Sequence, residues 1–192
     1  MLAQPNAGRG SFGLLCRYPG SVTGSDDSAM PAQDGASPGR RVCDSYSEYA
    51  EITLPNDANP LGTLFGGKLM QWVDLAASIA ASRHARCAVV TASIDSLTFL
   101  RPVHIGQLVT LRSAVNRVFR TSMEVGVKVF VEDLRTGVVQ HVSSAYLTFV
   151  AIGGEGRRVI PPPVVPETPD ELRRYEQAGQ RRAYRLAKRG AV

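Results

Sequence analysis

The chain contains little cysteine, and none of it is arranged for a disulfide framework or a metal site. Cys16, Cys43 and Cys87 lie far apart in a chain of 192 residues and form no CxxC pair. Disulfide scaffolds and zinc modules need paired or clustered cysteines, so both classes are excluded. Sparse, unpaired cysteine suits a reducing compartment, and we expect a cytoplasmic protein.

Long hydrophobic runs are also missing. No apolar stretch approaches the roughly 18 residues of a membrane-spanning helix. The N-terminal segment mixes Gly, Ser and Pro and lacks the apolar core of a secretory signal. The three histidines, His84, His104 and His141, show no HExxH spacing. We therefore expect neither a membrane span, nor a metal ion, nor a Ser-His triad, and we expect the histidines at the surface or at strand ends.

Acidic residues are scarce at the C-terminus, and the net charge of +5 originates there. Residues 171–192 hold seven Arg or Lys side chains against Glu171 and Glu176, so the rest of the chain is balanced. A basic tail can bind nucleic acid or an anionic membrane. Few aromatic residues interleave with these charges, however, and one short helix makes a weak footprint. We therefore favour neither partner.

Composition divides the chain into four segments. Residues 1–45 are rich in Gly, Ser and Pro without periodicity, which predicts a disordered leader. Residues 46–152 hold the periodic patterns of a folded domain. Residues 153–167 read as a proline-rich extended linker. Residues 168–192 read as a basic helix, because they open with the helix-start sequence TPDE.

The central segment predicts one helix and five strands. Residues 67–83 are almost wholly apolar with helical periodicity. The strand-like segments are residues 49–54, 87–100, 108–119, 122–132 and 138–152. Short turns join the last strands, which favours an antiparallel meander. One helix against one antiparallel sheet is an α+β fold.

One carboxylate, Asp74, lies at the border of the apolar face of this helix. At about 100° per residue, one arc holds the apolar residues of the helix. These are Leu69, Met70, Val73, Ala76, Ala77 and Ala80. An acid beside a buried face is costly unless it is hydrogen-bonded or has a use. We expect a chemical use, and the alternative is an interface carboxylate that is simply satisfied.

Two motifs resemble the signature of hotdog-fold acyl-CoA thioesterases. Residues 59–74 read N-x-x-G-x-x-F-G-G-x-L-M-x-x-x-D, and residues 97–103 read LTFLRPV. The resemblance covers about residues 48–152. It points to the single-domain bacterial acyl-CoA hydrolases and the paired domains of the brain-type cytosolic acyl-CoA hydrolase. It implies a hotdog fold, in which one long central helix is wrapped by a five-stranded antiparallel sheet.

The same resemblance implies hydrolysis of fatty acyl-CoA to free CoA and a carboxylic acid, with no cofactor besides the CoA of the substrate. It implies a homodimer, extended to a trimer of dimers, whose sites combine groups from two subunits. By this carry-over Asp74 is the general base, or less favourably a nucleophile. Asn59 of the other subunit orients the water or the thioester carbonyl, and the Gly67 amide receives the oxyanion.

The start of the predicted helix supports this interpretation physically. A helix N-terminus offers free N–H groups and a positive dipole end, and Gly66 and Gly67 permit close approach. Asp74 lies seven residues further, about 10 Å along the axis. One helix therefore cannot easily present both groups to one carbonyl, and a second subunit would solve this.

Several assignments keep alternatives. The expected substrate-binding residues are Phe65, Gly66, Ser93 and Arg101. Asp95 could mimic a second catalytic acid, but we favour a structural role or a position beside the pantetheine arm. Asn59 could be only a turn residue, and the glycine pair only a helix entry. The rival function is an acyl-CoA sensor without turnover. The presence of Asn59, Gly67 and Asp74 together, and the lack of a helix-turn-helix, favour the enzyme.

Overall fold

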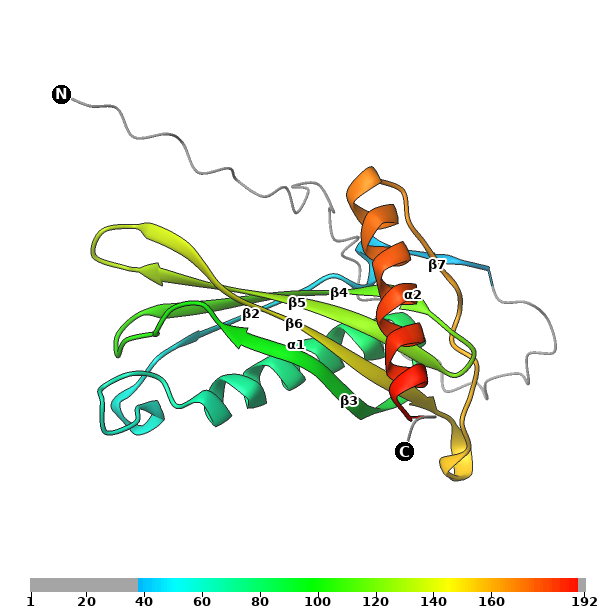
Figure 1. Ribbon diagram of the computed structural model, residues 1–192, viewed down its shortest axis with the longest axis horizontal. Coiled ribbons are helices and arrows are strands. Elements are labelled where there is room, and N and C mark those ends of the chain that lie inside the picture. The colour runs from blue at the N-terminus through cyan, green and yellow to red at the C-terminus, as the bar shows by residue number, and fades with distance from the viewer. Residues whose placement is uncertain (1–37, 190–192) are drawn as a thin grey trace, which may run out of the picture. The chain divides into compact units, whose positions relative to one another are not determined.

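The computed structural model describes residues 38–189, and its frame is a five-stranded antiparallel sheet. The strands are β2 (Ser47–Ile52), β3 (Ala88–Phe99), β4 (Leu108–Val118), β5 (Ser122–Asp133) and β6 (Val138–Ile152). Their spatial order is β2-β4-β5-β6-β3 (Figure 1). The predicted meander holds for β4, β5 and β6. The chain places β3 at the far edge, beside β6, which the sequence pattern did not indicate.

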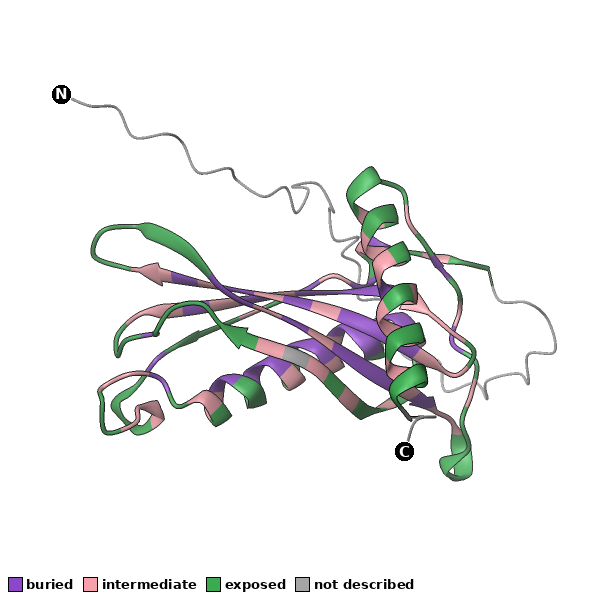
Figure 2. Cartoon of the chain, in the orientation of Figure 1, coloured by how far each residue is buried: buried purple, intermediate pink, exposed green. Residues whose placement is uncertain are grey.

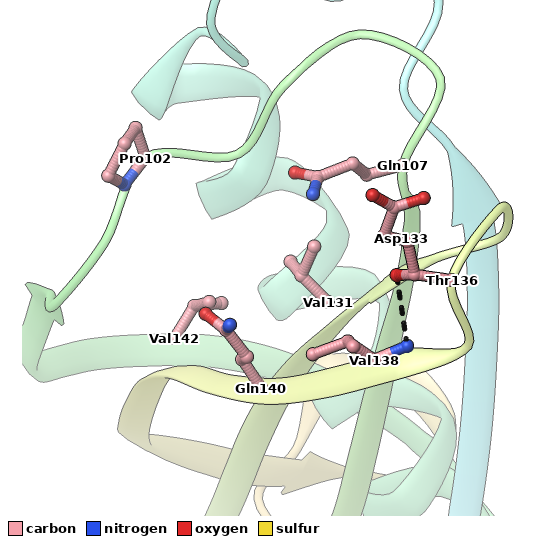
Figure 3. Close-up of a pocket in the computed structure, with 8 residues that line it drawn as sticks. All are labelled: Pro102, Gln107, Val131, Asp133, Thr136, Val138, Gln140 and Val142. Carbon is pink, nitrogen blue, oxygen red and sulfur yellow. Dashed lines mark hydrogen bonds between the residues drawn. The ribbon is translucent and has the colours of Figure 1, made fainter. Parts of the chain in front are cut away.

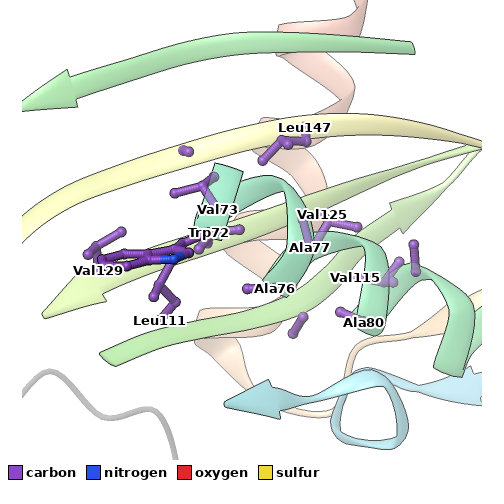
Figure 4. Packing of buried hydrophobic residues seen from close by; sticks show 14 of the residues in the cluster. Trp72, Val73, Ala76, Ala77, Ala80, Leu111, Val115, Val125, Val129 and Leu147 are labelled. Atoms are coloured by element: carbon purple, nitrogen blue, oxygen red, sulfur yellow. The ribbon is translucent and has the colours of Figure 1, made fainter. Parts of the chain in front are cut away.

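The long helix α1 (Gly66–Ala85) packs on one face of this sheet. Small side chains on its inner face, among them Ala76, Ala77 and Ala80, let the helix lie close to the valines of β4 and β5 (Figure 4). These valines alternate along each strand, so one face of the sheet is apolar. The expected α+β arrangement of one helix against one sheet is confirmed.

The buried stripe of α1 adds Trp72, Ala81 and His84 to the predicted arc and leaves out Met70. Trp72 is 3% exposed and belongs to the core, whereas Met70, expected inside, is 42% exposed. Met70 lies one turn before Asp74, on the flank where the sheet ends at its edge strand β3. The periodicity of the sequence predicts the direction of the buried face of α1. How far the sheet extends beside the helix decides which residues at the border of that face are covered.

The second helix, α2 (Pro169–Arg189), lies on the opposite face of the sheet from α1 (Figure 1). It contacts β4, and only Ala178 of its apolar residues is fully buried. Its outer side is exposed and its inner side half-buried (Figure 2). Its attachment is mostly polar: Arg181 forms an ion pair with Glu124 of β5, and Arg185 forms one with Asp95 of β3.

Part of the segment expected to be a leader belongs to the folded domain. Arg40–Arg41 form β1, which pairs in parallel with β7 (Val164–Val165), and Val42–Ser45 form the short helix η1. Val42 is buried, and the hydroxyl of Ser45 accepts a hydrogen bond from the Val115 amide at 2.9 Å. The boundary expected after residue 45 is therefore corrected to near residue 40. Residues 1–37, with Cys16, lie outside the described residues.

The proline-rich segment is also tied to the domain. Besides β7, it contains the short helix η3 (Gly154–Gly156). Elsewhere in the chain, another short helix, η2 (Pro55–Asp57), precedes α1. The Pro162 carbonyl accepts a hydrogen bond from Nε2 of His84 at 2.8 Å. His84 is fully buried in the last turn of α1, so its expected surface position is wrong. His104 and His141 are exposed, as expected.

Neither helix within residues 38–189 combines the length and the apolar character that crossing a bilayer requires.

Candidate active site

The start of α1 presents backbone donors that no side chain caps. Phe65 occupies the cap position and makes no side-chain capping bond. Its carbonyl accepts the amides of Lys68 at 2.9 Å and Leu69 at 3.2 Å, so the Gly66 and Gly67 amides precede the first intrahelical bonds. A Cβ atom at Gly67 would lie 2.9 Å from the Phe65 ring. Glycine at this position therefore leaves room for the Phe65 ring beside the helix N-terminus. The free amides of that N-terminus can stabilise a negative charge.

A hollow of about 350 Å³ adjoins this helix end and brings the two sequence motifs together. Gly66 comes from the first motif, and Arg101 comes from the second. Phe99 and Leu100 are both largely exposed and supply apolar wall. Arg101 donates a hydrogen bond to the Gln140 side chain at 3.3 Å. The hollow thus offers an apolar surface, nearby amides and one cation at its rim.

Asp74 lies midway along α1 and is held by a residue that sequence reasoning missed. The hydroxyl of Thr91, on β3, donates a hydrogen bond to Asp74 Oδ1 at 2.7 Å. Asp74 is half-buried and Thr91 is exposed, so the carboxylate remains reachable. No local pattern marks Thr91, because its role depends on β3 lying beside α1. A hydroxyl within a strand that follows the helix was the only available signal.

Asn59 is used by its own loop. Its side-chain oxygen accepts hydrogen bonds from the Leu61 amide at 2.9 Å and the Thr63 amide at 3.3 Å. Its side-chain nitrogen donates to the Thr63 hydroxyl at 2.9 Å. The turn-residue alternative therefore describes its contacts within one chain. The loop leads directly into the glycine pair, which keeps Asn59 near the helix end.

The structure does not bring all the expected residues together. Gly66 and Arg101 share a hollow, but Asp74 lies seven residues after Gly67 on the same rigid helix, which is about 10 Å. Within one described chain, the carboxylate and the open amides are therefore too far apart to act on one carbonyl, and we refer to these two regions as half-sites. Each half-site lies on a surface that a second molecule can reach.

Ser93 is separated from these half-sites by a β-bulge. The pairing of β3 with β6 skips a residue between Thr91 and Ser93, which reverses the alternation of faces. Thr91 consequently points to α1, whereas Ser93 lines a hollow of about 600 Å³ with residues of α2. Ser93 donates to Asp95 at 3.4 Å, and Asp95 is paired with Arg185. A structural part for Asp95 agrees with these contacts, and substrate contact by Ser93 stays a prediction.

A further hollow of about 260 Å³ lies at the β5–β6 turn (Figure 3). It is lined by Pro102, Gln107, Val131, Asp133, Thr136, Val138, Gln140 and Val142. Among its lining residues Asp133 is the single carboxylate, and within the turn the Val138 amide donates to the Thr136 hydroxyl at 3.4 Å. Over residues 38–189, no three His, Cys, Asp or Glu side chains are grouped to hold a metal ion.

Solved structures share this fold. An acyl-CoA hydrolase from Staphylococcus aureus, in complex with butyryl-CoA, CoA and CoA disulfide, matches with a TM-score of 0.75 and 36% identity. The match covers 79% of this chain and 93% of that one. A hexameric acyl-CoA thioesterase in its apo form matches with a TM-score of 0.77 and 39% identity, over 81% of this chain and 99% of the other. The protein is therefore an enzyme of the hotdog-fold class.

Sequence comparison leads to the same family. Residues 61–138 match the thioesterase superfamily. An uncharacterized acyl-CoA thioester hydrolase of Bacillus subtilis is 45% identical over 145 residues, which is 75% of this chain and 84% of that protein. The chain belongs to the thioesterase superfamily. The predicted hotdog fold and the predicted thioesterase enzyme are confirmed.

Proposed function

We propose that this protein hydrolyses acyl-CoA thioesters to free CoA and a carboxylic acid, at sites formed between two copies of the chain. The observation that carries the proposal is the half-buried Asp74 carboxylate held by the Thr91 hydroxyl. A carboxylate fixed in this way, yet open to solvent, has the geometry of a general base. Fatty acyl-CoA is the substrate class, and water is the only co-reactant.

The proposed reaction divides its work between the two half-sites. Asp74 accepts a proton from a water molecule, whose oxygen attacks the thioester carbonyl. The negative charge that develops on the carbonyl oxygen is stabilised by the Gly67 amide of the second copy, at its open helix end. Asn59 of that copy orients the water or the carbonyl. When the carbon–sulfur bond breaks, the proton held by Asp74 passes to the thiolate, which leaves as CoA.

The surface around Asp74 supports the pairing of two copies. Strand β3 is hydrogen-bonded to β6 on one side, and its other edge has no strand partner within residues 38–189. Exposed apolar side chains line this edge and the adjoining flank of α1, namely Met70, Val90, Ile94 and Phe99. An open edge strand with apolar neighbours is a template for another strand. A second copy laid along it would bring its own helix end towards Asp74.

The relatives add independent support. The matched structures of the Staphylococcus aureus hydrolase also include single alanine variants of an asparagine, an aspartate and a threonine. In that chain the three positions follow one another at the same sequence intervals as Asn59, Asp74 and Thr91 do in this one. A hexameric thioesterase among the matched structures supports assembly of the proposed dimers into a trimer of dimers.

The direct test is thiol release from a series of acyl-CoAs, from acetyl to palmitoyl. The parent enzyme should release CoA from part of the series. Asp74→Asn should lower kcat by roughly 10²–10⁴ with the fold retained, because a general base is lost. Glu155→Gln is the matched control: it removes an exposed carboxylate that pairs with the exposed Arg157, and it should leave kcat unchanged. Parent-level activity in Asp74→Asn would refute the base assignment.

A further inference from the structure

A second concave site lies away from the proposed catalytic groups and is lined by three arginines. The arginine pocket, as we call it, is formed by Arg120, Thr121, Ser122, Arg158 and Arg182 and has a volume of about 370 Å³. Among the described residues, no carboxylate lines it. Ser122 and Arg182 belong to β5 and α2, whereas Asp74 and Thr91 meet on the α1 side of the sheet. The pocket is therefore separate from the Asp74 half-site.

Three segments that are distant in sequence build the pocket, and each is anchored by the fold. Arg120 lies in the tight β4–β5 turn, which the Phe119 amide closes by donating to the Ser122 carbonyl at 2.7 Å. Arg158 follows η3 and is bridged to Ile152 at the end of β6. Arg182 comes from α2, where its guanidinium lies 4.6 Å from the centre of the Phe119 ring. The cations are brought together by tertiary structure.

The pocket arginines differ from Arg173, Arg181 and Arg185 of α2, each of which has an acid beside it. Arg181 and Arg185 are paired with Glu124 and Asp95, whereas none of the three pocket arginines forms an ion pair among the described residues. Like charges around one hollow repel each other, and this repulsion is relieved when an anion enters. Guanidinium groups present forked donors that match phosphate oxygens, and the hydroxyls of Thr121 and Ser122 add short-range donors.

We propose that the arginine pocket binds a phosphate group, carried as a phosphate monoester or as free phosphate. Two ligands could carry this phosphate. One is CoA itself, whose 3′-phosphate would enter the pocket while its thioester lies at an active site of the assembled enzyme. The other is a small phosphorylated molecule that binds apart from the substrate. Binding at the pocket can be measured without turnover, because no pocket residue takes part in the chemical steps of the proposed reaction.

The test measures binding without turnover, by calorimetry on the full chain at low salt. The probes are inorganic phosphate, CoA and dephospho-CoA. Arg158→Gln should weaken the binding of the recognised probe by about ten-fold or more, the usual effect of losing a charge-assisted contact. Arg157→Gln, its neighbour outside the pocket, removes the same charge and should change little. Arg182→Gln and Arg173→Gln form a second matched pair on α2.

The probes separate the two sources. Tighter binding of CoA than of dephospho-CoA, with the difference lost in Arg158→Gln, assigns the pocket to the substrate's 3′-phosphate. Binding of inorganic phosphate that is lost in Arg158→Gln, with equal affinity for CoA and dephospho-CoA, assigns it to a separate phosphorylated ligand. The proposal is overturned if no probe binds, or if Arg157→Gln and Arg158→Gln weaken binding equally. Acyl-CoA hydrolysis by the parent enzyme would stand in either case.

Discussion

Thr91 on β3 donates a 2.7 Å hydrogen bond to the Asp74 carboxylate on α1. This contact joins the edge strand of the sheet to the middle of the helix. It fixes the direction of the proposed base through one carboxylate oxygen, and we expect the other oxygen to take the proton from water.

Removing the Thr91 hydroxyl should weaken catalysis without unfolding the protein. Thr91→Val keeps the branched shape of the side chain and should lower kcat about ten-fold or more, because a hydrogen bond to a charged group is lost. Thr91→Ser keeps the hydroxyl and should retain most of the activity. Thiol-release kinetics on both variants, with thermal unfolding as the fold control, would decide. Equal rates in the two variants would contradict a role for the hydroxyl.

Two inactive variants should complement each other if each site is shared. A heterodimer of Asn59→Ala and Asp74→Ala chains carries one intact site and one doubly altered site. A statistical mixture of equal parts should therefore regain about a quarter of the parent activity, as two-fold symmetry requires. Co-expression with two affinity tags isolates the heterodimer, and its thiol release is compared with that of each homodimer. A verified heterodimer without activity would argue against the shared site.

The contact between α2 and the sheet should be stabilised by a buried ion pair. Arg181 makes two hydrogen bonds to Glu124, at 2.7 and 3.1 Å, and Glu124 is 0% exposed and also accepts from Asn116 at 3.1 Å. Arg181→Ala should lower the free energy of unfolding by about 3 kcal/mol, because it leaves a buried carboxylate without its cation. The measurement is urea unfolding.

Two further variants make this result specific. Arg173→Ala, which breaks an exposed pair with Asp170, should cost about 0.5 kcal/mol or less. The double variant Glu124→Leu with Arg181→Leu should recover much of the loss, since no charge is then stranded. If Arg181→Ala matched Arg173→Ala in stability, the ion pair would not hold α2.

Burial of His84 should make stability depend on pH. Burial lowers the pKa of His84 below its usual 6.5, and the nearby Arg40 guanidinium lowers it further against the opposing bond to Pro162. The unfolded chain therefore binds a proton before the folded one does. The free energy of unfolding should fall as pH drops below about 6.5, with a slope of at most about 1.4 kcal/mol per unit.

Urea unfolding of the parent, His84→Asn and His104→Asn between pH 8 and 5 would measure this effect. His84→Asn removes the titrating ring and should flatten the curve, although its overall stability should be lower. His104 is exposed, and its substitution should leave the slope unchanged. Identical slopes for the parent and His84→Asn would exclude His84 as the source.

Much of the fold could be predicted because its elements are locally encoded. The alternation of Met123, Val125 and Val127 marks β5, and the glycine pair marks the start of α1. The motif over residues 59–74 indicated Asp74 as the chemically important acid. Thr91 could not be found this way, because a strand hydroxyl acquires meaning only from the element packed beside it. Glu124 was equally hidden: it lies on the polar face of β5, where burial requires α2.

The sequence by itself determined which segments are helix and strand, which face of each is apolar, and which carboxylate lies at the border of the helix. These follow from periodicity and backbone preference, which act over a few residues. Tertiary structure alone decided that β3 lies at the edge beside β6, that a bulge turns Thr91 towards Asp74 and Ser93 away, and that three arginines surround one hollow. Such contacts join residues far apart in the chain, and only packing of the whole domain brings them within bonding distance.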